Sequence, residues 1–504
     1  MKKSFIFLIG MCFYLPFAEA QTQTVPFARH YWLNPQSVNY TLSPPTTDGN
    51  WMLAAARNEE GIAKKNTIAV FKLDNLYNIV STGSGAYTDA HVIGLPPTTS
   101  TCRFDTTVEF EAHCIVQSAI PDDNYVICGS LKRGNAQKCG MVIVLDANLN
   151  IVSLQEFEDV ETFYSAYMER GYYYVCGNMN NNNNRGGIVL QSVPGSTVSV
   201  SFITTTAWTY DKIRVRTNPG SGMFTVSGSG FDNMGRREIG AIIFDIQGGG
   251  GNFSTLSRFK FNPNHAINSK VVVSNYPGTG GMGLVLSVSD NQTIYTYLVN
   301  DYSQQQPPRI NTAFEIPIGE NILLEDIDCG SGQSTIDPQI AWVGNYPQQS
   351  AYYIHMDMRA TTGPPMPSTN VALTIFDPSP TANTYYSLHK VHFYKKNGGG
   401  SGDDFFHAGG YYKHSDGDKT TFVVTPDDPN VIEKKDCVGR GERRVHDMSI
   451  PATQTPSQSI RCYPANVFDL IAVKYIFCTS EDCEIDNCRN TLSPEEVKIK
   501  VINE

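Results

Sequence analysis

Tyr125-Val-Ile-Cys-Gly129, followed by Met141-Val-Ile-Val-Leu-Asp146, is the stretch that decides the fold of this chain. The first part is an apolar run that ends at a small residue, and the second is an apolar run that ends at Asp. A polar turn separates the two. The same pattern recurs about seven times, for example from Met223 to Gly228 and from Ala241 to Asp245. Such recurrence predicts one large domain built by adding copies of a small unit.

Each copy reads as four β-strands, of which the second and third are the most regular. These two are almost continuously apolar, which indicates that both of their faces are covered. No helical periodicity of useful length interrupts them, so we expect an all-β fold. The second strands are expected to begin at Trp51, Tyr125, Tyr172, Met223, Lys270, Gln339 and Phe405. The third strands are expected at Thr67–Asp74, Met141–Asp146, Gly187–Gln191, Ala241–Asp245, Gly283–Val288, Tyr352–Asp357 and Thr420–Thr425.

A unit of four strands and roughly fifty to seventy residues has the size of a propeller blade. The chain therefore resembles a seven-bladed β-propeller of the divergent kind common in secreted bacterial proteins, over about Gln36–Asp436. It matches the WD40, kelch and sialidase families only remotely. WD dipeptides are absent, and the kelch-like Gly409-Gly410-Tyr411 occurs in one copy. The turn His414–Thr420 is similar to the Asp-box of sialidase-like propellers, but it lacks the Gly and the aromatic residue at the places where that motif needs them.

Three segments are expected along the chain: a signal peptide at 1–20, the seven-bladed propeller at 21–436, and a Cys-rich C-terminal cap at 437–504. Lys2 and Lys3 precede an apolar run, and Ala18 and Ala20 supply the small residues that signal peptidase requires. We therefore expect export to the periplasm, the outer-membrane surface or the extracellular space. The cap is expected to complete the seventh blade or to pack across its edge.

The cysteines favour disulfides, because an exported protein meets an oxidising environment. The spacing of Cys478, Cys483 and Cys488 is not that of a zinc finger. Cys102 and Cys114 could close a small loop, and an odd cysteine could pair with another chain. The disulfide candidates are Cys102, Cys114, Cys128, Cys139, Cys437, Cys462, Cys478, Cys483 and Cys488.

Composition limits the partners. The formal net charge of -11, without a long basic run, excludes nucleic acid, because phosphate binding relies on clustered Lys and Arg. No segment after the signal peptide is long and apolar enough to predict a membrane span. With 41% hydrophobic and only 17% charged residues, the chain can bury a large core. The expected partner is a protein or glycan of the cell envelope or surface.

No catalytic, cofactor-binding or metal-binding residue is predicted, because none of the usual motifs occurs in the structural setting that it needs. The paired carboxylates lie beside turn residues and are interpreted as turn caps: Asp122-Asp123, Asp403-Asp404 and Asp427-Asp428. The alternative is a metal or acid–base site that would be built from histidines of the last two copies: His355, His389, His392 and His407.

The leading expectation is a non-enzymatic, exported propeller that binds a protein or glycan of the bacterial envelope. One alternative is a carbohydrate-active enzyme, a glycoside hydrolase or lyase, with an axial site. The other is a structural subunit of a surface assembly. An axial pocket with converging carboxylates, His or Arg would favour the enzyme, whereas a filled or apolar axis would favour the binding protein. Two apparent insertions, Gly85–Glu111 and Tyr302–Glu320, are the loops expected to carry function.

Overall fold

The computed structural model describes the chain from Phe27 to Ser449, with gaps. The described stretches are 27–31, 41–46, 48–57, 62, 64–74, 88–95, 104–117, 124–149, 151–169, 171–179, 186–193, 201–205, 208–218, 221–231, 237–247, 252–261, 272–278, 281–300, 309–318, 321–331, 338–359, 366–376, 384–394, 405–413, 419–424, 432–434 and 443–449. These residues form β-strands and no helix, which confirms the expected all-β class. Within the same stretches, therefore, no helix has the length and hydropathy of a membrane span.

The described strands form seven small sheets, mostly antiparallel, that follow one another along the chain. The first sheet consists of β2 (Thr41–Leu42), β3 (Trp51–Arg57), β4 (Thr67–Leu73), β5 (Thr88–Gly94) and β30 (Arg443–Ser449). The second consists of β6 (Val108–Gln117), β7 (Tyr125–Arg133), β8 (Cys139–Leu145) and β9 (Ile151–Phe157). The third consists of β10 (Val160–Glu169), β11 (Tyr172–Met179), β12 (Gly187–Ser192) and β13 (Ser201–Thr205).

The remaining four sheets continue the same order. The fourth consists of β14 (Trp208–Asn218), β15 (Ser221–Phe231), β16 (Arg237–Gln247) and β17 (Asn252–Phe261). The fifth consists of β18 (Val272–Gly278), β19 (Gly281–Ser289), β20 (Thr293–Asn300) and β21 (Arg309–Pro317). The sixth consists of β22 (Leu323–Ser331), β23 (Pro338–Tyr346), β24 (Ser350–Arg359) and β25 (Met366–Phe376). The seventh consists of β26 (Tyr385–Tyr394), β27 (Phe405–Lys413), β28 (Lys419–Val424), β1 (Phe27–Tyr31) and β29 (Ile432–Lys434).

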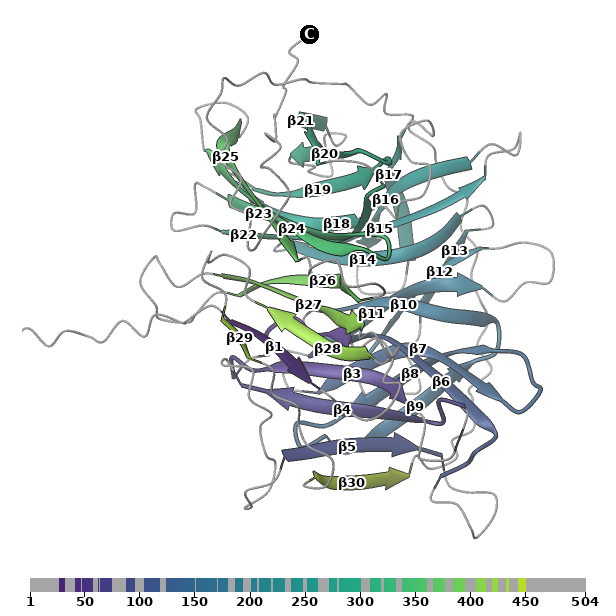
Figure 1. Ribbon diagram of the computed structural model, residues 1–504. Coiled ribbons are helices and arrows are strands. Elements are labelled where there is room, and N and C mark those ends of the chain that lie inside the picture. Colours follow the sequence, from purple (N-terminus) through teal and green to yellow (C-terminus); the bar gives the residue numbers. More distant parts are fainter. Residues whose placement is uncertain are drawn as a thin grey trace, which may run out of the picture.

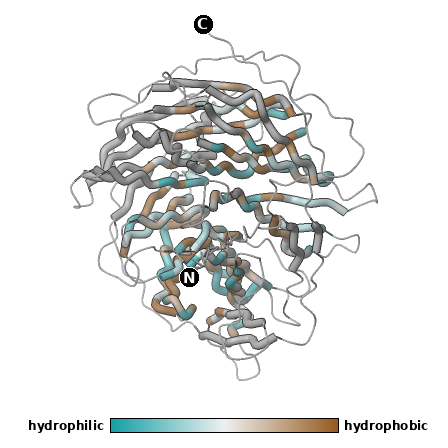
Figure 2. The backbone as a smooth tube through the Cα atoms, turned by 90° about the vertical axis from the view of Figure 1, so that its left-hand side faces the viewer, coloured by the Kyte–Doolittle hydropathy of each residue, from teal (hydrophilic) through white to brown (hydrophobic). Residues whose placement is uncertain are grey.

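The first strand of each sheet lies innermost, and these strands touch one another in sequence. The order of contact is β2, β6, β10, β14, β18, β22 and β26, and β26 in turn contacts β2. The small sheets therefore surround a common centre, as in a β-propeller. Figure 1 shows the sheets stacked along the molecule, and in Figure 2 hydrophobic and hydrophilic stretches alternate along the strands.

The buried core is divided into clusters, each of which fills the space between two neighbouring sheets. Between the second and third sheets, for example, Cys128 and Val142 pack in one cluster with Phe163 and Val175. This packing explains the apolar second and third strands of the repeat, because both of their faces are covered by neighbouring sheets.

The N-terminal strand closes the ring. β1 pairs antiparallel with β28, with Ala28 opposite Val424, although the two strands lie at opposite ends of the described chain (Figure 1). The expected propeller segment, 21–436, includes this strand, although no copy of the repeat was expected before about Gln36. A terminal strand that completes the last sheet removes two exposed sheet edges at once, one on each partner.

Most of the expected second and third strands are present, but the fifth copy was assigned incorrectly. The segment that begins at Lys270 corresponds to β18, which is the first strand of its sheet, and Gly283–Val288 lies in β19, which is the second. Each of the two apparent insertions also contains a strand of the repeat. Gly85–Glu111 contains the outer strand β5, and Tyr302–Glu320 contains the outer strand β21.

Little of the expected C-terminal cap falls within the described residues. Its segment β30 pairs in parallel with β5, at the outer edge of the first sheet. The rest of 437–504, like the expected signal peptide at 1–20, lies outside the described residues.

Candidate functional site

A β-bulge recurs in the innermost strand of five sheets. In each case one extra residue of that strand has no opposite residue in the second strand, so the register shifts across it. The extra residues are His113, Tyr164, Asp211, Glu325 and His389. Because the bulge lies at the same place in each strand, the residues that follow it reach the same central cavity.

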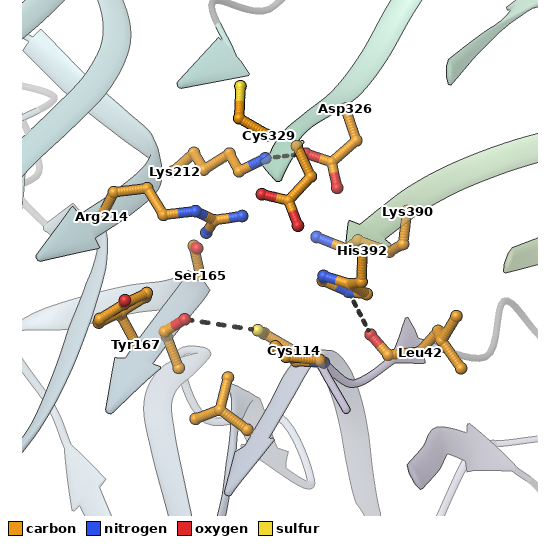
Figure 3. A pocket seen from close by; sticks show the side chains of 14 residues that line it. Leu42, Cys114, Ser165, Tyr167, Lys212, Arg214, Asp326, Cys329, Lys390 and His392 are labelled. Carbon is orange, nitrogen blue, oxygen red and sulfur yellow. Dashed lines mark hydrogen bonds and ion pairs between the residues drawn. The ribbon is translucent and has the colours of Figure 1, made fainter. Parts of the chain in front are cut away.

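The cavity has a volume of about 240 Å³ and is lined by two tiers of side chains (Figure 3). The first tier directly follows the bulges and consists of Cys114, Ser165, Lys212, Asp326 and Lys390. The second tier lies two residues further along each strand and consists of Val116, Tyr167, Arg214, Asp328 and His392. Residues Leu42 and Pro44, at and beyond the end of β2, contribute to the wall. The structure thus brings together three basic side chains, two carboxylates and one imidazole.

Lys212 and Asp326 form a buried ion pair between the fourth and sixth sheets. The Lys212 ammonium donates to Asp326 Oδ1 and, at 3.1 Å, to the carbonyl oxygen of Ile327. The two side chains are only 8% and 2% exposed. Burial lowers the pKa of Lys212, and the positive charges of Arg214 and Lys390 act in the same direction. The carboxylate of Asp326 offsets this buried charge.

The two aspartates of β22 that line the cavity also accept backbone hydrogen bonds from the neighbouring innermost strand. Asp326 Oδ2 accepts from the amide of Val391 at 3.2 Å, and Asp328 Oδ2 accepts from the amide of Phe393 at 2.8 Å. These bonds satisfy amides of β26 that point away from its own sheet partner. They also fix the position of the two carboxylates at the cavity wall.

Arg214 lies against an aromatic ring at the wall. Its guanidinium carbon is 5.9 Å from the centre of the Tyr167 ring, and its Nη1 donates to the carbonyl oxygen of Ile213 at 3.1 Å. A planar guanidinium has five N–H donors, so most of its hydrogen-bonding capacity remains for other groups at the cavity. The tyrosine ring restricts its orientation.

His392 joins the last sheet to the first. Its Nε2 is 3.0 Å from the carbonyl oxygen of Leu42. Because a carbonyl oxygen can only accept, Nε2 carries the hydrogen and Nδ1 is the acceptor nitrogen. Burial lowers the pKa of His392 well below its usual value, and Arg214 and Lys390 lower it further. The imidazole is therefore neutral at ordinary pH.

The other three histidines of the expected site do not line the cavity. His389 Nδ1 is 3.6 Å from Glu325 Oε2, and its Nε2 is 3.0 Å from Ser387 Oγ. The ring of His407 lies 4.2 Å from that of Trp51, measured between centroids, and His355 packs near Phe406. In the described part of the chain, no group of three or more His, Cys, Asp or Glu side chains has the arrangement of a metal site.

The described cysteines carry free thiols: Cys114, Cys128, Cys139, Cys176 and Cys329. Cys102 and the cysteines beyond residue 436 lie outside the described residues, as do the three carboxylate pairs near Asp122, Asp403 and Asp427. Disulfide pairing of this protein stays a prediction.

The sequence patterns did not single out most of the charged residues of the cavity. Their signal is a charged residue, an apolar residue and a second polar or charged residue in succession, which occurs at Lys212–Arg214, Asp326–Asp328 and Lys390–His392. In a strand this alternation places both polar side chains on one face. The bulges then turn the shared face toward the cavity, and the pattern of the innermost strand alone does not indicate a bulge.

No family model matches this chain, and no curated protein sequence matches it. Among solved structures, it is similar to a neuraminidase-like protein from A/flat-faced bat/Peru/033/2010, with 8% identity, a TM-score of 0.36, and coverage of 79% of this chain and 90% of that chain. It is also similar to an α-L-arabinofuranosidase from Fusarium graminearum, with 9% identity, a TM-score of 0.36, and coverage of 64% and 89%. A third is a GH32 β-fructofuranosidase from Bombyx mori, with 10% identity, a TM-score of 0.27, and coverage of 78% and 91%.

The expectation of a non-enzymatic binding protein of the envelope was wrong. The solved structures similar to this chain include glycoside hydrolases, although at 9–10% identity they transfer no activity to it. In addition, the centre of the molecule is neither filled nor apolar, because carboxylates, Arg, Lys and His converge on the cavity. The cavity therefore differs from the filled or apolar axis that was expected for a binding protein.

Proposed function

We propose that this protein is a seven-bladed β-propeller and a carbohydrate-active enzyme whose active site is the central cavity. The blade number is supported by the seven described sheets and by the closed sequence of contacts between their innermost strands. The observation that carries the proposed activity is the convergence of two tiers of charged side chains, from several sheets, on one cavity.

The charges of the cavity suit a ligand that is rich in hydroxyl groups. Lys212 is offset by Asp326, whereas Arg214 and Lys390 bring N–H donors to the cavity wall, and Asp328 and the Nδ1 atom of His392 bring acceptors. Donors and acceptors are thus close to balance and come from different sheets. A sugar hydroxyl both donates and accepts, and it satisfies both kinds of group. The ring of Tyr167 adds an apolar surface for the face of a sugar.

Glycosidic cleavage requires a group that transfers a proton. Asp326 is engaged through both oxygens, by Lys212 and by the amide of Val391. Asp328 is held through Oδ2 by the amide of Phe393 and is the carboxylate that we assign to acid–base chemistry. Arg214 and Lys390 would stabilise negative charge that develops during bond cleavage.

Turnover of a panel of neutral and acidic oligosaccharides tests this function. We expect release of reducing ends from at least one glycan, and Asp328→Asn should lower the rate by about a hundredfold or more. Asp146→Asn is the matched control, because Asp146 caps a turn at the end of β8 with a hydrogen bond from the amide of Asn148. An unsaturated product would identify a lyase, and a saturated one a hydrolase. No turnover of any glycan, or equal rates for both variants, would overturn the proposal.

A further inference from the structure

Cys114 and Cys128 face each other across two neighbouring strands of the second sheet. They are opposite residues in the antiparallel pair of β6 and β7, directly after the bulge at His113. Both side chains belong to the same core cluster, so they lie on the same face of the sheet. Opposite Cα atoms in such a pair are roughly 4.5–5.5 Å apart, within the range of about 4.4–6.8 Å that a disulfide spans.

The two thiols differ in their access to the cavity. Cys114 lines it, whereas Cys128 lies one strand further from the centre and is 0% exposed. Their Sγ atoms each lie 3.9 Å from a carbonyl oxygen of β10, that of Ala166 for Cys114 and that of Phe163 for Cys128. A small molecule in the cavity therefore reaches Cys114 before Cys128. Once Cys114 has reacted, its sulfur lies beside the thiol of Cys128.

The surroundings of the two sulfurs shift their pKa values in opposite directions. A hydrogen bond from Cys128 lowers the pKa of Cys114 to about 6, and the nearby charges of Lys390 and Arg214 contribute to the same effect. Burial raises the pKa of Cys128 well above its usual value, and the hydrogen bond to Cys114 raises it further. Cys114 therefore loses its proton more readily than Cys128. This is the division between an attacking and a resolving cysteine.

We propose that Cys114 and Cys128 form a redox-active dithiol at the cavity wall that reduces small disulfides. The Cys114 thiolate attacks one sulfur of the incoming disulfide, whose S–S bond breaks and releases a first thiolate. Cys128 gives its proton to that thiolate and attacks the Cys114 sulfur, which forms the Cys114–Cys128 bond and releases the second thiolate. Two protein sulfurs are oxidised and the two sulfurs of the small disulfide are reduced. This activity does not depend on the proposed glycan chemistry.

The third sheet contains a natural control for this arrangement. Cys176 occupies on β11 the place that Cys128 occupies on β7, but the residue opposite it is Ser165. Burial raises the pKa of Cys176, and Cys176 is 0% exposed. Cys176 is therefore buried like Cys128, but no cysteine lies opposite it with which it could form a disulfide.

The test treats the reduced, full-length protein with bis(2-hydroxyethyl) disulfide, a small uncharged probe, and maps disulfides by mass spectrometry of peptides. We expect a Cys114–Cys128 link with release of two equivalents of 2-mercaptoethanol, and its loss on addition of dithiothreitol. Cys128→Ser should stop at a mixed disulfide on Cys114, Cys114→Ser should give neither product, and Cys176→Ser should behave as the unchanged protein. A folded, unchanged protein without the Cys114–Cys128 link would overturn the proposal.

Alkylation provides a second readout that needs no variant. Iodoacetamide should modify Cys114 at least tenfold faster than Cys139 at pH 7, because burial raises the pKa of Cys139 to about 11. The rate at Cys114 should reach half of its maximum near pH 6. Equal rates at the two cysteines would contradict the assignment of Cys114 as the attacking thiol.

Discussion

The glycine that ends the second strand of the repeat is required by a close approach of two backbones. In five sheets this glycine lies opposite the residue that precedes the bulge of the innermost strand. A Cβ atom added to it would lie well inside 3.0 Å of a backbone carbonyl oxygen of that strand. The five glycines are Gly129, Gly177, Gly228, Gly344 and Gly410. The small residue of the repeat is therefore the sequence mark of a bulge on the neighbouring strand.

Replacing one of these glycines should destabilise the protein. Gly129→Ala would place its methyl group against the carbonyl oxygen of Glu111, and the backbone would have to move to relieve the clash. We expect a loss of about 3 kcal/mol in the free energy of unfolding, measured with urea. Lys132→Ala, at an exposed position of the same strand, is the control. Equal free energies of unfolding for both variants would show that the bulge accommodates the added methyl group without loss of stability.

His407 should make stability depend on pH. Burial lowers its pKa from 6.5 to about 3 in the folded protein. Below pH 6.5 the His407 imidazole therefore binds a proton in the unfolded chain but not in the folded chain. The stability that is present above pH 6.5 is lost as the pH falls toward 3. Between pH 7 and pH 5 the loss from this residue should be about 2 kcal/mol.

Unfolding titrations of the unchanged protein and of His407→Phe at several pH values measure this effect. The variant removes the titrating group but keeps a ring beside Trp51. Its stability should fall less steeply with acid, although His392 contributes to the slope of both proteins because its pKa is also lowered. Parallel slopes would contradict the assignment to His407.

Among the strands, β22 has aspartate side chains that accept hydrogen bonds from backbone amides of β26, as a neighbouring strand would. Its carboxylates accept hydrogen bonds from amides of β26 in the next sheet, so they join two sheets that share no strand pairing. The same carboxylates line the cavity. Asp326 and Asp328 therefore both join the two sheets and form part of the cavity wall.

Asp328→Ala should leave the amide of Phe393 without its acceptor. Since a partly buried donor without an acceptor is costly, we expect a loss of about 1 kcal/mol in the free energy of unfolding. Asp328→Asn keeps an acceptor oxygen and should lose much less. The comparison of both variants by urea unfolding separates this positioning role from acid–base chemistry, which both variants should abolish. Similar losses for Ala and Asn would indicate that the negative charge itself holds the two sheets together.

Second and third strands were largely predictable because apolar runs and turns define them locally. β7 begins at the expected Tyr125, and β8 contains the expected run from Met141. The fifth copy was misread because β18 ends in polar residues and Gly, and so resembles a second strand that leads into a turn. Outer strands such as β5 were not recognised, because they carry fewer apolar residues. The cavity was not predictable, since it depends on bulges and on contacts between sheets.

For the whole molecule, closure depends on a strand from the far end of the chain. β1 is sandwiched between β28 and β29 in the last sheet. Nothing in the short segment Phe27–Tyr31 marks it as part of a repeat whose other strands lie near residue 420. Its location was therefore outside the reach of pattern analysis, which compares neighbouring copies only.

Removal of residues 1–31 should open the last sheet. The edge of β28 would lose its partner, so we expect a lower midpoint of thermal unfolding and self-association through the exposed edge. Removal of residues 1–26 is the control, because it leaves β1 in place. Calorimetry and size-exclusion chromatography measure both effects. An unchanged midpoint and a monomeric profile after the longer deletion would show that β1 does not hold the ring closed.

The pairing of β1 with β28 also has a kinetic consequence. The intermediate sheets are built from neighbouring strands and can form as soon as each repeat emerges during synthesis. The last sheet cannot, because β1 emerges first and its partners β28 and β29 emerge only after nearly the whole described chain has been made. Contacts between residues so distant in sequence form slowly, because closing a long loop costs chain entropy before the contacts add any stability. Ring closure should thus be the late, rate-limiting event of folding, and an unclosed ring the form most exposed to proteases.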